Sequence, residues 1–221
     1  MARAPSAKGK SRLTPDLSSE RLHALKSALL ENTLLALETV PDVVVFFTPD
    51  GAEREIAWLA DACGAGLQAC VAKSRSRVPQ GKGDLGARML SAIRYLLEAR
   101  NFDAAILVGS DIPWLTAERV REAADVLEAS GGVVLGPADD GGYYLIGRTR
   151  AHEALFEGIA WGTATVLKDT LHVAERSEIA ANLLQSAYDV DTIDDVRRLE
   201  RDLSVAPAGA CAALRRWFRQ A

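Results

Sequence analysis

The sequence has 221 residues and a formal net charge of −4, because 26 Lys and Arg stand against 30 Asp and Glu. This length allows a sizeable core in one large domain or two small ones. The charge balance argues against a dedicated nucleic-acid-binding protein, which usually carries a basic excess. No apolar run reaches the about 18 residues that span a bilayer, and the N-terminus lacks the apolar segment of a secretory signal. The three cysteines, Cys63, Cys70 and Cys211, form no C-x-x-C pair, which predicts free thiols, no zinc site and a place in the cytoplasm.

The first half of the chain alternates between helical and strand patterns. Residues 1–17 are basic and irregular, and leucines at helical spacing then predict a helix over 18–39. The apolar run VVVFFT, at 43–48, is typical of a strand that is buried on both faces. A helix through Trp58 and a weaker strand at 67–72 follow.

The second half continues this alternation. The predicted elements are a basic loop at 73–83, a helix over 84–99, an apolar strand at 104–109, a helix over 116–129, a strand, a turn and a strand across 132–147, a helix over 163–176, a short strand at 180–186, a helix from 192 and a terminal helix within 207–220. Such alternation predicts an α/β fold of three layers, with a mostly parallel, Rossmann-like sheet between helices. We expect one domain over 1–221. Its C-terminal helical extension, 204–221, docks either on the body or on a second copy in a homodimer.

Ligands of open α/β sheets bind beyond the carboxyl ends of the strands, so the residues that follow each predicted strand are candidates for the site. Ser110 and Asp111 follow the strand at 104–109. A carboxylate in this position suits a divalent metal that bridges the phosphates of a nucleotide. Alternatively, Asp111 caps a turn, because Asp before x-Pro is common in turns.

Two adjacent acids, Asp139 and Asp140, come before Gly141 and Gly142. The glycines permit close backbone approach or a positive φ. This segment is suited to a metal, a sugar hydroxyl or an acceptor amine, but Asp-Gly also favours an ordinary hairpin turn.

A third acidic segment starts at Asp189 and leads into the helix from Thr192. Either Asp191 or Thr192 would cap that helix, and acids in its first turn would complement the helix dipole. Capping alone accounts for these residues. One acid could instead complete a metal site begun by Asp111.

The basic first loop carries Lys10 and Arg12, which offer a point charge and a bidentate fork for phosphate oxygens. Arg3 belongs to the same basic stretch. The pattern G-x-x-x-x-G-K-[ST] is absent, which excludes a P-loop ATPase. No G-x-S-x-G elbow is present either, which disfavours a serine hydrolase.

A second glycine-rich stretch, at 80–89, opens a helix. Backbone N–H groups at a helix start favour a phosphate or a polar base edge. We expect Asp84 to cap this helix and Arg88 to reach back towards it. A plain turn from loop to helix is the alternative.

Six stretches resemble, in this order, those of one bacterial family of GT-A-type proteins: ARAPSAKGKSRL, GKGDLGARM, LVGSDIPWL, LGPADDGGYYLIG, IAWGTATVL and YDVDTIDDVRRL. Its members are usually described as uncharacterised nucleotide-diphospho-sugar transferases, or as glycosyltransferases linked to arsenosugar biosynthesis. The resemblance extends from Ala2 to about Leu203. The fold is shared with nucleotidyltransferases such as 2-phospho-L-lactate guanylyltransferase and the molybdenum-cofactor guanylyltransferases.

The resemblance implies a role for most of the candidate residues. Asp111 corresponds to the metal-binding catalytic acid, Asp191 to a second metal ligand, and Asp140 to the segment that faces the sugar or acceptor. Apart from the resemblance, we expect Asp140 to serve as base for the acceptor hydroxyl. The nucleotide and phosphate side comprises Arg3, Lys10, Arg12, Asp84, Gly86, Arg88 and Ser110, and the sugar or acceptor side comprises Asp139, Gly141, Gly142 and Tyr143. No role follows for Trp161 or Thr163.

One element of the family pattern, the usual first strand, is missing from this sequence. Family members begin with an apolar strand that runs into A-[KR]-A-P, whereas only Met1 precedes the equivalent residues here. Removing a central strand would leave buried backbone groups of its neighbours unpaired, at about 1–3 kcal/mol each. Our hypothesis is therefore that Met1 is internal to a longer natural chain, with the strand encoded upstream. Otherwise the sheet would have a gap.

Together these features predict a metal-dependent glycosyltransferase that uses Mg²⁺ or Mn²⁺, a nucleotide-diphospho-sugar donor and a small-molecule acceptor. The first alternative is a guanylyltransferase-like nucleotidyltransferase that acts on a nucleoside triphosphate. It is disfavoured because G-Y-Y, at 142–144, replaces the G-T-N of those transferases. The second alternative is a non-catalytic nucleotide-binding protein or a truncated pseudoenzyme. The sequence does not identify the base, the sugar or the acceptor.

Overall fold

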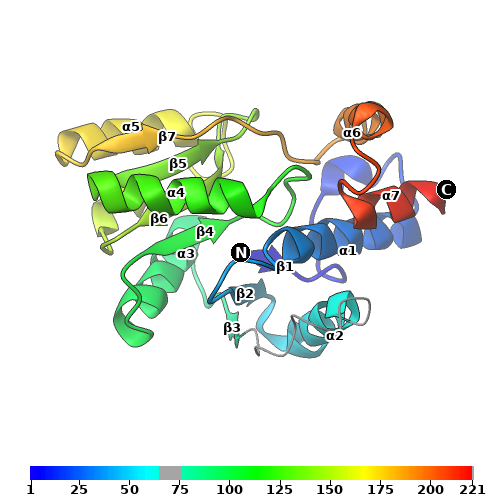
Figure 1. The fold of residues 1–221 in the computed structure, drawn as a ribbon, viewed down its shortest axis with the longest axis horizontal. Helices are drawn as coiled ribbons and strands as arrows, with labels where there is room; N and C mark the ends of the chain where they lie inside the picture. Colours follow the sequence, from blue (N-terminus) through cyan, green and yellow to red (C-terminus); the bar gives the residue numbers. More distant parts are fainter. Residues whose placement is uncertain (65–75, 221) are drawn as a thin grey trace. The chain divides into compact units, whose positions relative to one another are not determined.

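The computed structural model describes residues 1–64 and 76–220, which divide into two compact units (Figure 1). Unit 1 comprises Met1, 80–109 and 118–187, and unit 2 comprises 2–79, 110–117 and 188–221. Each unit is built on a sheet of its own. The single domain expected over 1–221 stays a prediction.

Unit 2 is built on a parallel sheet of order β1-β2-β3. Its strands are β1 (Ala2–Arg3), β2 (Val44–Thr48) and β3 (Ser76–Pro79), and its helices are α1 (Ser19–Ala36), α2 (Glu53–Gly64), α6 (Ile193–Val205) and α7 (Ala212–Arg219). Short 3-10 turns at Ser11–Leu13 and Asp50–Ala52 lead into α1 and α2. β2 is the apolar run that the sequence predicts as a buried strand, and its central residues are buried.

Helix α1 is the element that joins the two cores of unit 2. It begins after Ser18, whose side chain accepts a hydrogen bond from Arg21 N, as expected for an N-cap. Leu30 and Leu34 pack into a cluster with β2 and α2. Leucines on the other side of α1 pack into a second cluster with α6 and α7. Both faces of α1 are therefore covered, which agrees with its leucine-rich sequence.

The C-terminal segment packs on the body of unit 2. The Trp217 indole of α7 is buried, donates to Arg21 O at 3.2 Å and lies under the Arg21 guanidinium, which is 4.0 Å from the ring centroid. Of the two predicted docking places for this segment, the described chain uses its own body. A homodimer stays a prediction.

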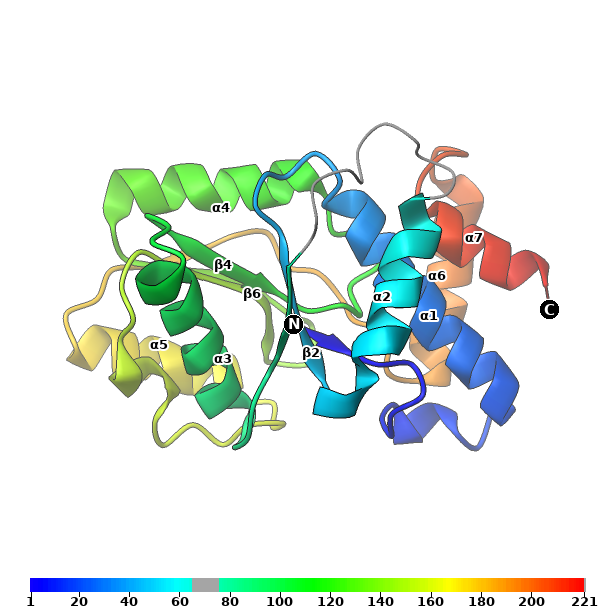
Figure 2. The ribbon, with the colours of Figure 1, turned by 90° about the horizontal axis from the view of Figure 1, so that it is seen from below.

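Unit 1 is built on a mixed sheet of order β4-β6-β5-β7. Its strands are β4 (Ala105–Val108), β5 (Val133–Pro137), β6 (Tyr143–Arg148) and β7 (Ala181–Leu183), and its helices are α3 (Leu85–Arg94), α4 (Ala117–Ser130) and α5 (Val166–Arg176), with a π-helical turn at Tyr95–Ala99 and a 3-10 turn at Glu153–Phe156. Figure 2 shows α4 on one face of this sheet and α3 and α5 on the other. The predicted α/β class, with parallel pairing and covering helices, is confirmed.

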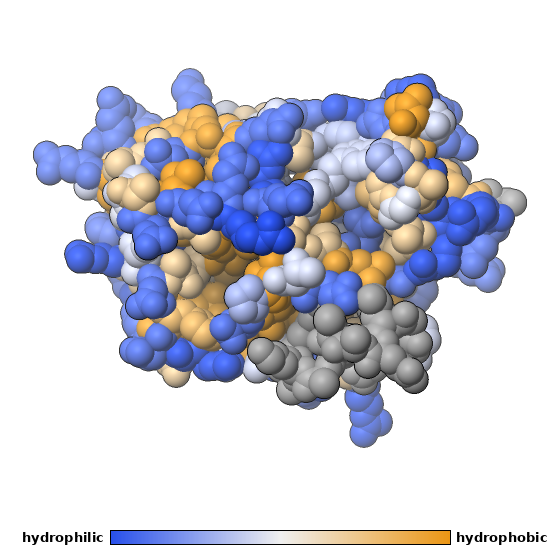
Figure 3. Space-filling view, in the orientation of Figure 1, coloured by the Kyte–Doolittle hydropathy of each residue, from blue (hydrophilic) through white to orange (hydrophobic). Residues whose placement is uncertain are grey.

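Strand β6 departs from the parallel pattern, since it runs antiparallel to both β4 and β5. The cause is the short connection 138–142 between β5 and β6, because antiparallel neighbours can be joined by a tight turn whereas parallel ones need a long crossover. β4 lies at the edge of this sheet, and its Ile106 and Val108 are half-buried. The space-filling view shows an apolar area below α4, over this part of unit 1 (Figure 3).

Two stretches predicted to be irregular contain strands. Within 1–17, Ala2–Arg3 form β1 and pair in parallel with β2. Residues 76–79, inside the basic stretch predicted as a loop over 73–83, form β3 and pair in parallel with β2. The four residues SRVP have little strand character of their own, so the ladder with β2 decides their conformation. The strand predicted at 67–72 lies outside the described residues.

The helices formed by the described residues are short or contain charged side chains. The longest, α1, has 18 residues and includes Glu20, Lys26 and Glu31. Among the described residues, no helix combines the length and the apolar character that a membrane crossing needs.

Candidate functional site

Asp111 lies in the loop after β4, within the segment 110–117 of unit 2. Two donors anchor this loop at the Pro113 carbonyl: Asn32 Nδ2 at 2.8 Å and Cys211 Sγ at 3.2 Å. The carbonyl of Asp111 accepts from Val190 N at 3.1 Å. Three hydrogen bonds therefore hold the main chain of this loop. The Asp111 side chain is 41% exposed and thus available to a ligand.

A second pair of acids reaches the same place from the segment Asp189-Val190-Asp191. Val190 is fully buried in the core with α1 and α6. Asp189 and Asp191 on either side of it are only half-buried, and their carboxylates meet that of Asp111. The spacing D-x-D is the sequence signal that places Asp189 beside Asp191. Asp189 was not among the predicted site residues.

Capping of α6 is carried out by Thr192 and not by Asp191. The Thr192 side chain accepts from Asp195 N, and the Asp195 carboxylate accepts from Thr192 N at 2.7 Å, which forms a complete capping box. The Asp191 carboxylate is therefore not used as a cap. Of the two predicted roles of this segment, capping falls to Thr192 and leaves Asp191 to the acidic cluster.

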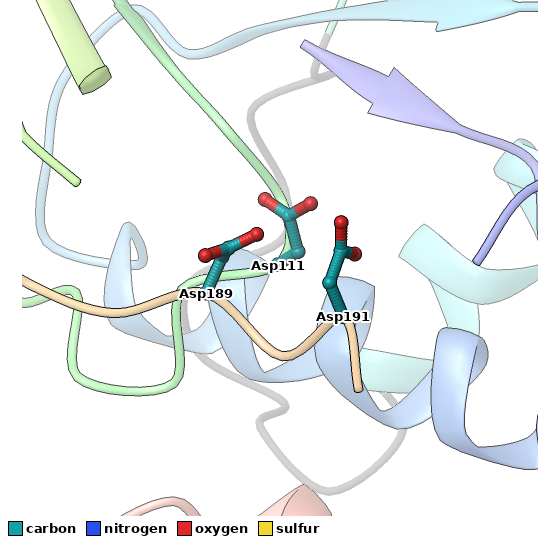
Figure 4. A group of neighbouring side chains, drawn as sticks. All are labelled: Asp111, Asp189 and Asp191. Atoms are coloured by element: carbon teal, nitrogen blue, oxygen red, sulfur yellow. The ribbon is translucent and has the colours of Figure 1, made fainter. Parts of the chain in front are cut away.

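Asp111, Asp189 and Asp191 form a carboxylate cluster in which one oxygen of each residue lies within 4.8 Å of the others. Figure 4 shows the three side chains pointing to the same side of the chain. Carboxylate oxygens are the preferred ligands of Mg²⁺, Ca²⁺ and Mn²⁺. This donor set fits the divalent metal that the sequence predicts, and all three members belong to unit 2.

The Lys10 ammonium occupies the cluster as an internal cation. Its Nζ donates to Asp191 Oδ1 at 2.6 Å and to Val190 O at 2.6 Å, and lies 3.4 Å from Asp111 Oδ2. Burial disfavours the charged form of Lys10, but the nearby Asp111 and Asp191 more than offset it and raise the pKa above its ordinary value. A cation thus already fits among these oxygens, which supports the suitability of the cluster for a metal.

A pocket of about 310 Å³ opens beside the cluster. It is lined by Arg3, Gly9, Lys10, Lys26, Leu29, Ser110, Asp111 and Asp191. Cationic side chains and carboxylates therefore share one cavity, as a site for a phosphate and a metal would require. The structure brings together the predicted residues Arg3, Lys10, Ser110, Asp111 and Asp191. The predicted Arg12 is exposed and is not among the lining residues.

Lys26 is a lining residue that the sequence analysis missed. It lies on α1 and donates from Nζ to Ala7 O at 2.6 Å. Burial, and then the positive charge of Arg3, lower the pKa of Lys26 below its ordinary value. Leu29, one turn further along the same helix face, also lines the pocket. The sequence signal for this role is a lysine among the leucines of a predicted helix. Leucine spacing predicts the helix but does not indicate what such a lysine contacts.

The predicted nucleotide-side residues of 80–89 belong to unit 1. Asp84 caps α3 by accepting from Ala87 N at 2.8 Å, and Arg88 Nε reaches back to Asp84 O at 3.2 Å, as the sequence predicts. Gly86 meets the indole of Trp161, since a Cβ on Gly86 would lie 2.5 Å from its Nε1. Trp161 therefore has a packing role, and the nucleotide-binding role of these residues stays a prediction.

The predicted acceptor-side residues also lie in unit 1, at the turn between β5 and β6. Asp140 Oδ1 accepts from Gly142 N at 2.8 Å, and its side chain is exposed. Gly141 has φ +88°, and a Cβ there would lie 2.1 Å from Ala164 O, so only glycine fits. Burial raises the pKa of the Tyr143 phenol. This segment is thus a hairpin turn. Any role of it in sugar or acceptor binding, and that of Asp139, stays a prediction.

Comparison with known proteins agrees with the resemblance seen in the sequence. A crystal structure from Desulfovibrio desulfuricans G20, described as a "putative nucleotide-diphospho-sugar transferase", is similar with a TM-score of 0.83 and 29% sequence identity, over 99% of this chain and 94% of that one. No curated protein matches the sequence significantly. Residues 33–163 match the model of a family described as "Uncharacterized protein conserved in bacteria (DUF2064)". Because the matched segment exceeds half of the sequence, the chain belongs to this bacterial family.

Proposed function

We propose that this protein is a metal-dependent glycosyltransferase that uses a nucleotide-diphospho-sugar donor. The observation that carries the proposal is the pocket of unit 2, in which Asp111 and Asp191 lie beside Lys10 and Arg3. A diphosphate bound with a divalent metal needs both kinds of charge within a few ångströms. The likeness to a protein named as such a transferase supports the same conclusion.

In this proposal, Asp111, Asp189 and Asp191 would hold Mg²⁺ or Mn²⁺. When bound, such a metal supplies positive charge that offsets the negative charge growing on a leaving diphosphate. The chain contributes rigidity, since bonds to the Pro113 and Asp111 carbonyls hold the Asp111 loop. Rigid ligands matter because a site that is already oriented loses little free energy to reorganisation during the reaction.

The basic side chains would orient the phosphates. Arg3 Nη1 donates to Lys8 O at 2.7 Å, which shapes the first loop around the pocket. Positive charge from Arg3 and Lys10 would favour an anionic ligand at this loop.

We propose separately that Asp140 acts as base for the acceptor hydroxyl. The Asp140→Asn variant tests this, because a base is needed for turnover but not for donor binding.

The experiment is a thermal-shift screen of the chain against sugar nucleotides and nucleoside triphosphates, with and without Mg²⁺ or Mn²⁺, followed by turnover assays on the ligands that bind. Bound ligand raises the melting temperature by mass action. We expect a metal-dependent shift with a sugar nucleotide, lost in Asp111→Ala. The matched control is Asp194→Ala, since Asp194 is 83% exposed, pairs with Arg197 and is not a member of the carboxylate cluster.

The other outcomes are equally informative. A metal-dependent shift with triphosphates alone would contradict the proposal in favour of a nucleotidyltransferase. Nucleotide binding that survives Asp111→Ala, without turnover, would indicate a non-catalytic binding protein.

We also propose a cytoplasmic location, because the scattered cysteines suit a reducing compartment.

A further inference from the structure

The cations that line the pocket of unit 2 differ in how their charge is balanced. Lys10 forms ion pairs with Asp111 and Asp191. Among the described residues, Arg3 and Lys26 instead donate to main-chain carbonyls, those of Lys8 and Ala7. A carbonyl satisfies a donor but carries no net charge. Arg3 and Lys26 therefore bring positive charge to the pocket, and at Lys26 the charge of Glu55 offsets it only in part.

The surroundings of Lys26 disfavour the charged form of its side chain. It is half-buried, and burial and the like charges of Arg3 and Lys10 lower its pKa, although the opposite charge of Glu55 offsets part of this effect. Burial and like charge both disfavour an ammonium ion, whereas an anion in the pocket would relieve both effects. Such an arrangement is costly in the free protein and becomes favourable when a ligand of opposite charge binds.

The geometry of Lys26 leaves it able to bind that ligand. An ammonium group has three N–H donors, and the Ala7 carbonyl takes one of them at 2.6 Å. Lys26 lies on the long helix α1, one turn before Leu29, which also lines the pocket, and its bond to Ala7 O anchors the side chain. Anchoring of this kind reduces the entropy lost when the side chain orders around a ligand.

We infer that Lys26 is a further binding residue of this site, which contacts the diphosphate of the donor, and that the pocket binds diphosphate without help from base or sugar. This inference rests on the proposed function for the identity of the donor. The carboxylate cluster would hold the metal, while Arg3 and Lys26 would contact the diphosphate. The alternative is that Lys26 only fastens the first loop through Ala7.

The first experiment measures binding of inorganic pyrophosphate, in the presence of Mg²⁺, by isothermal titration calorimetry. We expect Lys26→Met to weaken binding about tenfold to a hundredfold, since it removes a charge-assisted hydrogen bond. Lys26→Arg should stay within about threefold of the parent, because it keeps the charge and the donor. The matched control is Lys8→Met. Lys8 is an exposed lysine of the first loop and does not line the pocket.

The second experiment needs no variant and separates ligand contact from loop fastening. The lysines of the parent protein are reductively methylated in the presence and in the absence of pyrophosphate and Mg²⁺. Mass spectrometry then measures the extent of methylation at each lysine. We expect pyrophosphate to slow the modification of Lys26 severalfold while that of Lys8 is unchanged. A residue that only fastens the loop would show no such protection.

The outcomes are distinguishable from those of the proposed function. If sugar nucleotides are used but Lys26 is neither protected nor needed for pyrophosphate binding, the inference is wrong and the proposed function stands. If Lys26 is protected and needed while no sugar nucleotide is used, the inference stands and the proposed function is wrong. Failure of the unmodified protein to bind pyrophosphate overturns the inference.

Discussion

Lys10 Nζ and Asp191 Oδ1 lie 2.6 Å apart, although 181 positions separate the two residues in the sequence. The contact joins the first loop to the segment that precedes α6. Only 12% of the Lys10 side chain is exposed, so the ammonium belongs to the carboxylate cluster and not to the solvent. Without a metal, a cation of the protein itself thus neutralises part of the negative charge of this cluster.

This contact predicts that Lys10 competes with a metal. The Lys10→Met variant should bind Mn²⁺ alone about tenfold more tightly than the parent, equivalent to 1.4 kcal/mol, because it removes a positive charge from the three carboxylates. Electron paramagnetic resonance of free Mn²⁺ measures this affinity directly. Lys8→Met, which removes an exposed charge of the same loop, should leave it unchanged. Weaker Mn²⁺ binding by Lys10→Met would contradict the competition.

Asp189 should matter for metal binding as much as its predicted neighbours. The Asp189→Asn variant keeps the size of the side chain but removes one of the three charges, so Mn²⁺ affinity should fall by about tenfold or more. The same resonance titration measures it. Asp194→Asn is the control, since its carboxylate pairs with Arg197 at the helix surface. Equal affinities in the two variants would remove Asp189 from the metal site.

Gly86 should be needed for packing, independently of any nucleotide. The Gly86→Ala variant places a Cβ 2.5 Å from the Trp161 indole nitrogen. Overpacking of this kind costs about 1–3 kcal/mol, so urea denaturation should give a lower free energy of unfolding. The control is Gly51→Ala, where a Cβ meets nothing within 4 Å, and a change within about 0.5 kcal/mol is expected. Equal stabilities would mean that Trp161 moves aside freely.

Cys211 should be a slow nucleophile. Burial raises the pKa of its thiol to about 11, so the reactive thiolate forms only as the pH approaches that value. At pH 8, alkylation by iodoacetamide should be about a hundredfold slower than for free cysteine, whose pKa is about 8.5. Mass spectrometry of the Cys211 peptide measures this rate. A rate like that of free cysteine would show that the contact with Pro113 O opens readily.

Much of the local structure could be predicted because its causes are local. Leucine spacing and the Ser18 cap define α1, and the apolar runs predicted as strands become β2, which is buried at its centre, and β4, which is buried at alternate residues. The capping of α3 by Asp84 was also predictable, because a cap bonds to a backbone group only three residues away. β3 was not predicted, since its weak sequence becomes a strand only through its ladder with β2.

By itself, the sequence determined the α/β alternation and identified Asp111 and Asp191 as acids that follow strands. Only the tertiary structure decided that Asp189 joins them and that Lys10 lies among them. It also decided that Lys26 of α1 faces the pocket. The physical reason is range: caps and periodicity act within a few residues, whereas charges brought together from segments up to 181 positions apart are placed by the packing of the core.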